Sequence, residues 1–331
     1  MKAIQIYRTG APEVLEYLDL PTPMPSPTQV LVKAHSIGVC MPEIMVRKGK
    51  YHWMPPLPAI PGIEMSGTVI AAGDKVTSLK IGQQVWVSAR EFKDRGGCYA
   101  EYIAAEAELI YALPAGVDME EAAGLANYQV AWHLLYSATQ GFQYDWILAP
   151  AAAGGVGSAL IQLARTTGKR VIGLVSSMEK AAFCIEQGAV AAINYKTGNI
   201  GEEIGAATGG QGVDLILDPV GGPNMGKLFD YLAPFGTLIL YGGIEGPADP
   251  NVLEPMRRPP ARNLAFRTFT MHAFDAWPER RASATHELLR LFAAGAIKPP
   301  IYDRIPLSEA RRAHEIFESG KVLGKLIMKP C

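Results

Sequence analysis

A glycine-rich turn most restricts the fold of this chain: Ala151-Ala152-Ala153-Gly154-Gly155-Val156-Gly157. An apolar run, Trp146–Pro150, precedes it and is typical of a buried strand, while Gly157–Thr167 after it carries apolar residues at helical spacing until Gly168 ends the pattern. Glycine lacks the Cβ that would block a tight turn between such a strand and helix. The pattern predicts the opening β-turn-α unit of a parallel sheet.

Strands and helices keep alternating after this turn. Further strands are predicted at Arg170–Val175, Ala191–Asn194, Val213–Asp218 and Phe235–Tyr241, with a helix at Glu179–Gln187. Repeated β-α-β units with short links imply a doubly wound parallel sheet covered by helices on both faces. The sequence therefore predicts an α/β domain over residues 121–262.

The two ends of the chain have a different pattern. Short strands punctuated by glycine and proline predict a barrel-like β domain in the first 120 residues, at 2–7, 30–34, 67–73 and 84–87. The tail predicts a helix at 278–295, a strand at 301–305, a helix at 308–319 with Ser308 as its N-cap, and a strand at 325–328.

The glycine-rich turn also has the chemistry of a dinucleotide site. A pyrophosphate binds where a strand turns into its helix, because backbone N–H groups and the positive helix end face it there. Here Ala151 takes the place of the first glycine, and the strand and helix on either side provide the context that the motif requires. We predict cofactor contacts from Gly154, Gly155, Val156 and Gly157; the alternative is a glycine-rich turn without a ligand.

The end of the next predicted strand indicates which nicotinamide cofactor binds. An NAD site usually has a carboxylate about 20 residues past the turn, on the ribose hydroxyl. Here the segment reads Val175-Ser176-Ser177-Met178-Glu179-Lys180, with serine at the strand tip. Serine hydroxyls and a lysine ammonium bind a 2′-phosphate that a carboxylate would repel. Ser176, Ser177 and Lys180 thus favour NADPH, unless Lys180 is only a solvated residue and Ser177 only an N-cap.

Composition excludes several classes of protein. The 331 residues suit two domains, and 49% hydrophobic with 19% charged residues suits a folded globular protein. The formal net charge of −1 argues against binding to nucleic acid or acidic lipid. No apolar run is long enough for a signal peptide or a membrane helix, and the cysteines lack paired spacing, so we expect a cytoplasmic protein.

Several motifs together give the chain a family resemblance. They are the turn at 151–157, Gln162-Leu163-Ala164-Arg165, Gly188-Ala189 leading to Ile193-Asn194-Tyr195, Gly10-Ala11-Pro12-Glu13-Val14-Leu15, Gly97-Cys98-Tyr99-Ala100-Glu101-Tyr102, Asp218-Pro219-Val220-Gly221 and Gly324-Lys325. In this combination, over nearly the whole chain, the sequence resembles the medium-chain dehydrogenase/reductase superfamily, and within it the NADPH:quinone oxidoreductases.

The resemblance implies an architecture and further site residues. A GroES-like β-barrel catalytic domain would be built from residues 1–120 and 263–331, with a Rossmann domain at 121–262 and the active cleft between them. Tyr195 would join Ser176 and Lys180 around the 2′-phosphate, and we also predict cofactor contacts from Gly242, Gly243 and Lys325. A homodimer formed through edge strands of the Rossmann sheets is implied as well.

The zinc enzymes of this superfamily need three protein ligands and an open position on the metal. Cys40 matches the first ligand, but Ile63 stands where a histidine would be, and the stretch around Asn127 has no cysteine. We therefore expect no metal.

Without a metal, the simplest reaction is hydride transfer from NADPH to a quinone or an α,β-unsaturated carbonyl. Tyr51 matches a substrate-pocket tyrosine of the quinone reductases and is our candidate donor to the developing oxyanion, although Met45 replaces a second such tyrosine. Cys40, Asn127 and Tyr128 are candidate pocket residues, with simple packing as the alternative. Two other functions stay open: an enoyl-thioester reductase, and a non-catalytic NADPH-binding structural protein.

Overall fold

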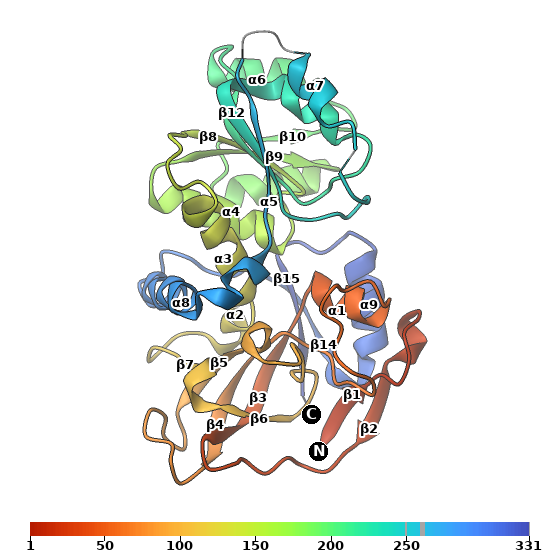
Figure 1. Cartoon of the computed structure of the whole chain (residues 1–331), viewed down its shortest axis with the longest axis vertical. Coiled ribbons are helices and arrows are strands. Elements are labelled where there is room, and N and C mark those ends of the chain that lie inside the picture. The colour runs from red at the N-terminus through yellow and green to blue at the C-terminus, as the bar shows by residue number, and fades with distance from the viewer. Residues whose placement is uncertain (249, 259–261, 331) are drawn as a thin grey trace. The chain divides into compact units, whose positions relative to one another are not determined.

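The computed structural model describes residues 1–248, 250–258 and 262–330. The chain forms two compact units, the first from Met1–Ala126 with Leu288–Cys331 and the second from Asn127–Glu287. The two ends of the chain, red at the N-terminus and blue at the C-terminus in Figure 1, thus belong to one unit. The chain returns to the first unit at Leu288, later than the expected residue 263. The strand Ala265–Thr268, which lies after residue 263, still pairs with the sheet of the second unit.

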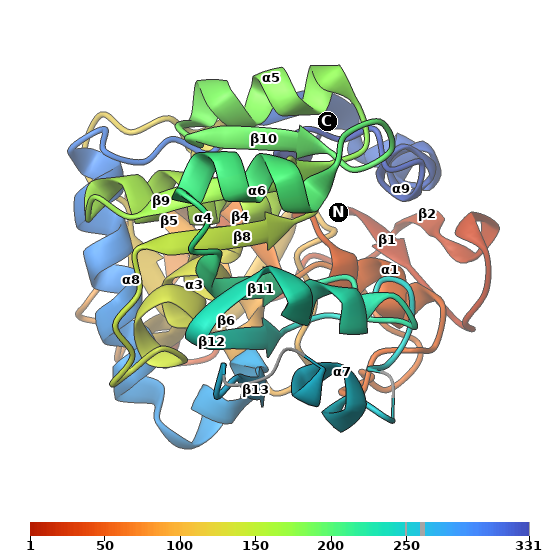
Figure 2. The ribbon, with the colours of Figure 1, turned by 90° about the horizontal axis from the view of Figure 1, so that it is seen from above.

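A six-stranded sheet, parallel throughout, forms the centre of the second unit. Its strands are β8 (Trp146–Pro150), β9 (Arg170–Val175), β10 (Ala191–Asn194), β11 (Val213–Asp218), β12 (Leu232–Leu240) and β13 (Ala265–Thr268). They lie in the order β10-β9-β8-β11-β12-β13, most of which Figure 2 shows side by side. This is the doubly wound order in which the sequence runs outward from the centre in both directions, as the alternating pattern predicts.

Helices alternate with or flank the strands of the second unit along the chain. They are α3 (Leu125–Trp132, continued by a π-helical turn), α4 (Gly155–Thr166), α5 (Met178–Gln187), α6 (Ile200–Thr208), α7 (Leu253–Arg257) and α8 (Pro278–Ala293), together with 3-10 helices at Met225–Tyr231 and Met271–Ala276. Helices α4 and α5 pack on each other and on β9, whereas α6 packs on the 3-10 helix Met225–Tyr231. Leu148, Ile172, Ile216 and Leu238 are fully buried in the core that these elements enclose.

The first unit is built on a seven-stranded sheet. Its members are β3 (Gln29–Val39), β4 (Glu64–Ala72), β5 (Gln84–Ser88), β6 (Tyr102–Glu106), β7 (Ile110–Ala112), β14 (Ile301–Pro306) and β15 (Lys325–Lys329). The order is β14-β15-β3-β4-β5-β7, with β6 also paired to β3, and a separate pair joins β1 (Lys2–Gln5) to β2 (Glu16–Asp19). Strand β15 therefore lies inside the sheet, beside β3.

Three short helices accompany this sheet: α1 (Met41–Arg47), α2 (Met119–Ala122) and α9 (Ala310–Glu318). The expected N-cap at Ser308 is wrong. A 3-10 turn at Leu307–Glu309 comes first, so Glu309 takes the N-cap position of α9, without a side-chain cap. In the described parts of the chain, no helix is long and apolar enough to cross a membrane.

Candidate functional site

The glycine-rich turn joins β8 to α4 at the carboxyl end of the strand. Ala151 has a φ of 53°, in the left-handed region that glycine adopts more readily. A Cβ on Gly157 would lie 2.4 Å from the carbonyl oxygen of Ala152, so only glycine lets the helix approach the turn this closely. Both features follow from the requirement that the chain reverse sharply between strand and helix.

The amino end of α4 has the character of an anion site. Gly154 is its N-cap, with extended backbone and no side-chain cap, and no acidic residue lies in the first turn. The N–H groups at the start of the helix, and the positive end of its dipole, therefore remain available to a phosphate. The predicted contacts Gly154, Gly155, Val156 and Gly157 all lie here.

The predicted 2′-phosphate residues come together at the carboxyl ends of β9 and β10. The ammonium of Lys180 donates a hydrogen bond to Ser176 Oγ at 3.0 Å, and Ser177 is the N-cap of α5, accepting from the backbone N–H of Lys180 at 3.3 Å. Tyr195 follows β10, its side chain is half exposed, and its N–H donates to the carbonyl of Val175. Both roles that we weighed for Ser177 are thus compatible, because its cap fixes the turn from which Lys180 extends.

The topology adds a loop that the sequence analysis did not include in the site. Strands β8 and β11 are neighbours, and the chain leaves them toward opposite edges of the sheet, which is where doubly wound folds bind ligands. Asp218 ends β11; it is buried, and its carboxylate accepts hydrogen bonds from the N–H groups of Val220 and Gly221. Gly242 follows β12, and a Cβ there would lie 2.4 Å from the carbonyl oxygen of Pro219. Asp218–Gly221 matched the family motif, but only the strand order indicates that it borders this site.

Asn127 and Tyr128 both lie on α3. Tyr128 is 1% exposed, and its hydroxyl donates to Gln162 Oε1 on α4 at 2.8 Å. This contact ties α3 to the helix that begins at the glycine-rich turn, and agrees with the packing alternative for Tyr128. Asn127 is half-buried.

A cluster of charged groups surrounds Cys40 in the core of the first unit. The Cys40 thiol donates to Glu64 Oε1 at 3.2 Å, and the Lys325 ammonium contacts both Cys40 Sγ, at 2.7 Å, and the Glu64 carboxylate. Glu64 Oε2 also accepts from the N–H of Ala126, 2.9 Å away. Lys325, a predicted cofactor contact, is 2% exposed and pairs with Glu64 here.

A second carboxylate lies next to this cluster. Glu43 accepts hydrogen bonds from the N–H groups of Cys40 and Ile63. Burial raises the pKa of Glu43 to about 7 against the opposing effect of Lys325, and burial raises the pKa of the Cys40 thiol well above its usual range. Across the described residues, no group of three or more His, Cys, Asp or Glu side chains is arranged to hold a metal ion.

Tyr51 belongs to the core of the first unit. It is 8% exposed, and its ring centroid lies 5.8 Å from that of Trp53. Its neighbour His52 is exposed. With so small an exposed fraction, only a small part of Tyr51 is accessible to a substrate.

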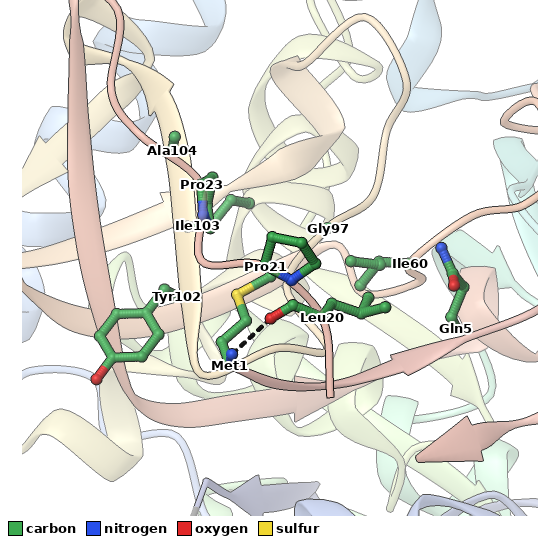
Figure 3. A pocket seen from close by; sticks show the side chains of 10 residues that line it. All are labelled: Met1, Gln5, Leu20, Pro21, Pro23, Ile60, Gly97, Tyr102, Ile103 and Ala104. Carbon is green, nitrogen blue, oxygen red and sulfur yellow. Dashed lines mark hydrogen bonds between the residues drawn. The ribbon is translucent and has the colours of Figure 1, made fainter. Parts of the chain in front are cut away.

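A hollow of about 430 Å³ also lies in the first unit. Figure 3 shows it beside the N-terminal amino group, which donates to the carbonyl of Leu20. Its lining is mainly apolar and contains none of the predicted site residues: Met1, Gln5, Leu20, Pro21, Pro23, Ile60, Gly97, Tyr102, Ile103 and Ala104. The candidate site described above is therefore a different place in the molecule.

Comparison with known proteins places this chain in a family. Residues 26–115 match the alcohol dehydrogenase GroES-like domain, and residues 187–328 match the family described as zinc-binding dehydrogenase. The chain is 31% identical to the quinone oxidoreductase of Rattus norvegicus, over 99% of this chain and 97% of the relative, and 32% identical to that of Pseudomonas aeruginosa, over 99% of both. The structure of Escherichia coli quinone oxidoreductase complexed with NADPH has a TM-score of 0.88 at 28% identity, covering both chains fully. The chain belongs to the quinone oxidoreductase family of the medium-chain dehydrogenase/reductase superfamily.

Proposed function

We propose that this protein is an NADPH-dependent reductase that transfers a hydride to a quinone or a related conjugated carbonyl compound. The observation that carries the proposal is the pairing of an uncapped helix end at Gly154 with the Lys180–Ser176 pair at the neighbouring strand. One recognises a pyrophosphate and the other a 2′-phosphate, and NADPH has both. Relatives bearing the name quinone oxidoreductase support the substrate class.

The residues present fit this cofactor. Gly157 lets the first turn of α4 lie against the backbone of Ala152, which brings the start of the helix to the turn where a pyrophosphate would bind. Gly242 similarly lets the chain after β12 lie against the carbonyl oxygen of Pro219. Bound NADPH supplies the hydride. Ser176, Ser177, Lys180 and Tyr195 hold the adenosine end, while a role of Gly242, Gly243 and Lys325 toward the cofactor stays a prediction.

The chain itself would supply orientation and one hydrogen-bond donor. We assign the donor role to the Tyr51 hydroxyl, with Cys40, Asn127 and Tyr128 as pocket residues. The buried ammonium of Lys325 lies against Cys40 and Glu64, and its positive charge opposes binding of a metal cation beside them. We therefore propose a reaction that needs no metal.

Steady-state oxidation of NADPH with a panel of quinones and enones tests the function. We expect turnover with at least one quinone, with NADPH preferred over NADH, and no stoichiometric zinc by elemental analysis. Tight NADPH binding without turnover on any member of the panel would favour the non-catalytic alternative. Turnover confined to acyl thioesters would favour the enoyl-thioester reductase.

We also propose a cytoplasmic homodimer. Cys40, Cys98 and Cys184 are free thiols, as a reducing compartment maintains them. Strand β13 ends the sheet of the second unit among the described residues, and an edge strand is a template for pairing with a second copy. Light scattering of the purified protein should give the mass of two chains, and a monomer mass would rule the dimer out; fractionation of the native cells checks the compartment.

A further inference from the structure

A cysteine and a lysine lie in direct contact in the core of the first unit, although 285 positions separate them in the chain. Cys40 follows β3 and Lys325 opens β15, and these strands are paired, with Val39 opposite Leu326. The strand pairing fixes the positions of both backbones. The two side chains therefore start from neighbouring points of the sheet, and Sγ and Nζ lie 2.7 Å apart.

The distance and the surroundings suit a covalent bond. Atoms that are both bonded to one shared oxygen atom stand about as far apart as Sγ and Nζ stand here. Cys40 is 4% exposed and Lys325 2%. Glu64 contacts both groups, so one carboxylate is in reach of every proton that a reaction between them must release.

We propose that Cys40 and Lys325 are a modification site at which hydrogen peroxide forms an oxygen-bridged Sγ–O–Nζ cross-link. This inference is independent of the proposed reductase function, since it rests on a side-chain cluster within one unit. The link would covalently join the end of β3 to the start of its neighbour β15.

The chemistry requires two molecules of peroxide. The first transfers an oxygen atom to Sγ: the S–O bond forms, the O–O bond breaks, sulfur is oxidised to the sulfenic acid and one water leaves. The Lys325 ammonium then gives one proton to Glu64 and becomes an amine. In the second oxidation the O–Nζ bond forms, and the sulfenic O–H and one Nζ–H lose their hydrogens to the second peroxide, which becomes two waters. Glu64 finally returns its proton to the solvent.

The other described cysteines provide an internal comparison. Cys98 and Cys184 are both fully buried free thiols, and among the described residues neither sulfur has a hydrogen bond to a lysine nitrogen. Burial raises the pKa of all three thiols, and a lysine opposes this effect at Cys40 and at Cys184. At Cys40 that lysine, Lys325, is in hydrogen-bond contact with the sulfur. Oxidation at Cys40 should therefore give a cross-link, whereas oxidation elsewhere should stop at acids of sulfur.

The proposal is tested by treating the full-length protein with hydrogen peroxide, digesting it and analysing the peptides by mass spectrometry. We expect the Cys40 peptide joined to the Lys325 peptide, heavier than their sum by one oxygen and lighter by two hydrogens, and released by a thiol reductant. The Cys98→Ser/Cys184→Ser variant should still form the link. Lys325→Arg keeps a buried cation but lacks the amine, so its Cys40 should oxidise only to sulfinic or sulfonic acid.

Three results would overturn the proposal. The first is that Cys40 of the wild-type protein resists peroxide. The second is that Cys40 is oxidised to the sulfinic acid without a cross-link to Lys325. The third is a cross-link between the two peptides whose mass lacks the bridging oxygen. The wild-type digest gives each of these answers without any variant, so a folding defect in Lys325→Arg does not affect the test.

Discussion

The ammonium nitrogen of Lys180 lies 3.0 Å from the hydroxyl oxygen of Ser176, one helical turn earlier in the chain. Ser176 comes directly after β9, and Lys180 lies in the first turn of α5, so the pair projects from the carboxyl edge of the sheet. A cation and a hydroxyl donor at this position match the two needs of a phosphate monoester, charge and hydrogen bonds.

Lys180→Ala should therefore weaken NADPH but spare NADH. A hydrogen bond to a charged group contributes about 1.5–3 kcal/mol, which corresponds to a rise of roughly tenfold to a hundredfold in KM for NADPH. Lys169→Ala is the matched control, because Lys169 precedes β9 at the opposite edge and pairs with Asp145. Equal effects of Lys180→Ala on both cofactors would refute the 2′-phosphate assignment.

Gly157→Ala should destabilise the protein and weaken NADPH binding. The added Cβ would lie 2.4 Å from the Ala152 carbonyl, and overpacking of this kind costs about 1–3 kcal/mol. Gly205→Ala, inside α6 with open space around the new Cβ, should instead raise stability by about 0.5–1 kcal/mol. Urea unfolding and NADPH titration measure both; a Gly157→Ala protein as stable as Gly205→Ala would disprove the close approach.

Ala151→Gly should stabilise the turn. A φ of 53° costs a residue with a Cβ about 1–2 kcal/mol, and glycine avoids this cost. Because glycine also makes the unfolded chain more flexible, part of that stabilisation is lost, and the free energy of unfolding should rise by up to about 1 kcal/mol. Ala153→Gly, at a buried alanine of the same turn, should lower stability. Thermal melts of the two variants should shift in opposite directions, and a lower melting temperature for Ala151→Gly contradicts the argument.

Lys325→Met should be strongly destabilising. It leaves the Glu64 carboxylate buried without its cation, which typically costs about 3–5 kcal/mol. The double variant Lys325→Met/Glu64→Gln removes the orphaned charge and should recover part of that loss. Simple additivity of the single changes in a double-mutant cycle would show that the two groups do not interact.

His314 should make stability depend on pH. Burial first, and then Arg47, lower the pKa of His314 to about 3, from 6.5 in its unperturbed state. Below about pH 6.5 the unfolded chain binds a proton that the folded chain excludes, so this contribution to stability is lost as the pH falls. From pH 7 to pH 5 the loss should be about 2 kcal/mol.

His314→Phe should abolish this component of the pH profile. Tyr99→Phe removes only the hydroxyl that lies 3.1 Å from His314 Nε2, so it should keep the same slope as the wild-type protein. Unfolding free energies at several pH values measure the slopes. A His314→Phe protein with an unchanged slope would assign the effect to another group.

The sequence predicted the strands of the second unit best. The bounds expected for β8, β9, β10 and β11 are those of the structure, because each is a short apolar run bracketed by turn residues. Helix α6 was missed because Gly201 and Gly205 weaken its helical pattern. Helix α3 was given no bounds, because the apolar residues of its stretch show no helical periodicity.

In the candidate site, too, contacts between residues close in sequence were predicted, whereas a contact between distant residues was not. Ser176 and Lys180 are close in sequence, so spacing along one strand end and one helix was enough to bring them together. The contact between Cys40 and Lys325 depends on the pairing of β3 with β15, which no local pattern contains. Sequence reasoning assigned these two residues to separate roles because only the fold shows that they touch.

The position of β15 inside the sheet of the first unit has a consequence for synthesis. The residues of the second unit are contiguous and leave the ribosome complete, while the first unit still lacks the strand that lies between β14 and β3. Until Lys325 has been made, Glu64 lacks the ammonium group that pairs with it in the core. A nascent chain that stops shortly before β15 thus carries a complete second unit, whereas its first unit lacks the strand that pairs with β3, so the sheet of the first unit is completed only after the second unit has been made.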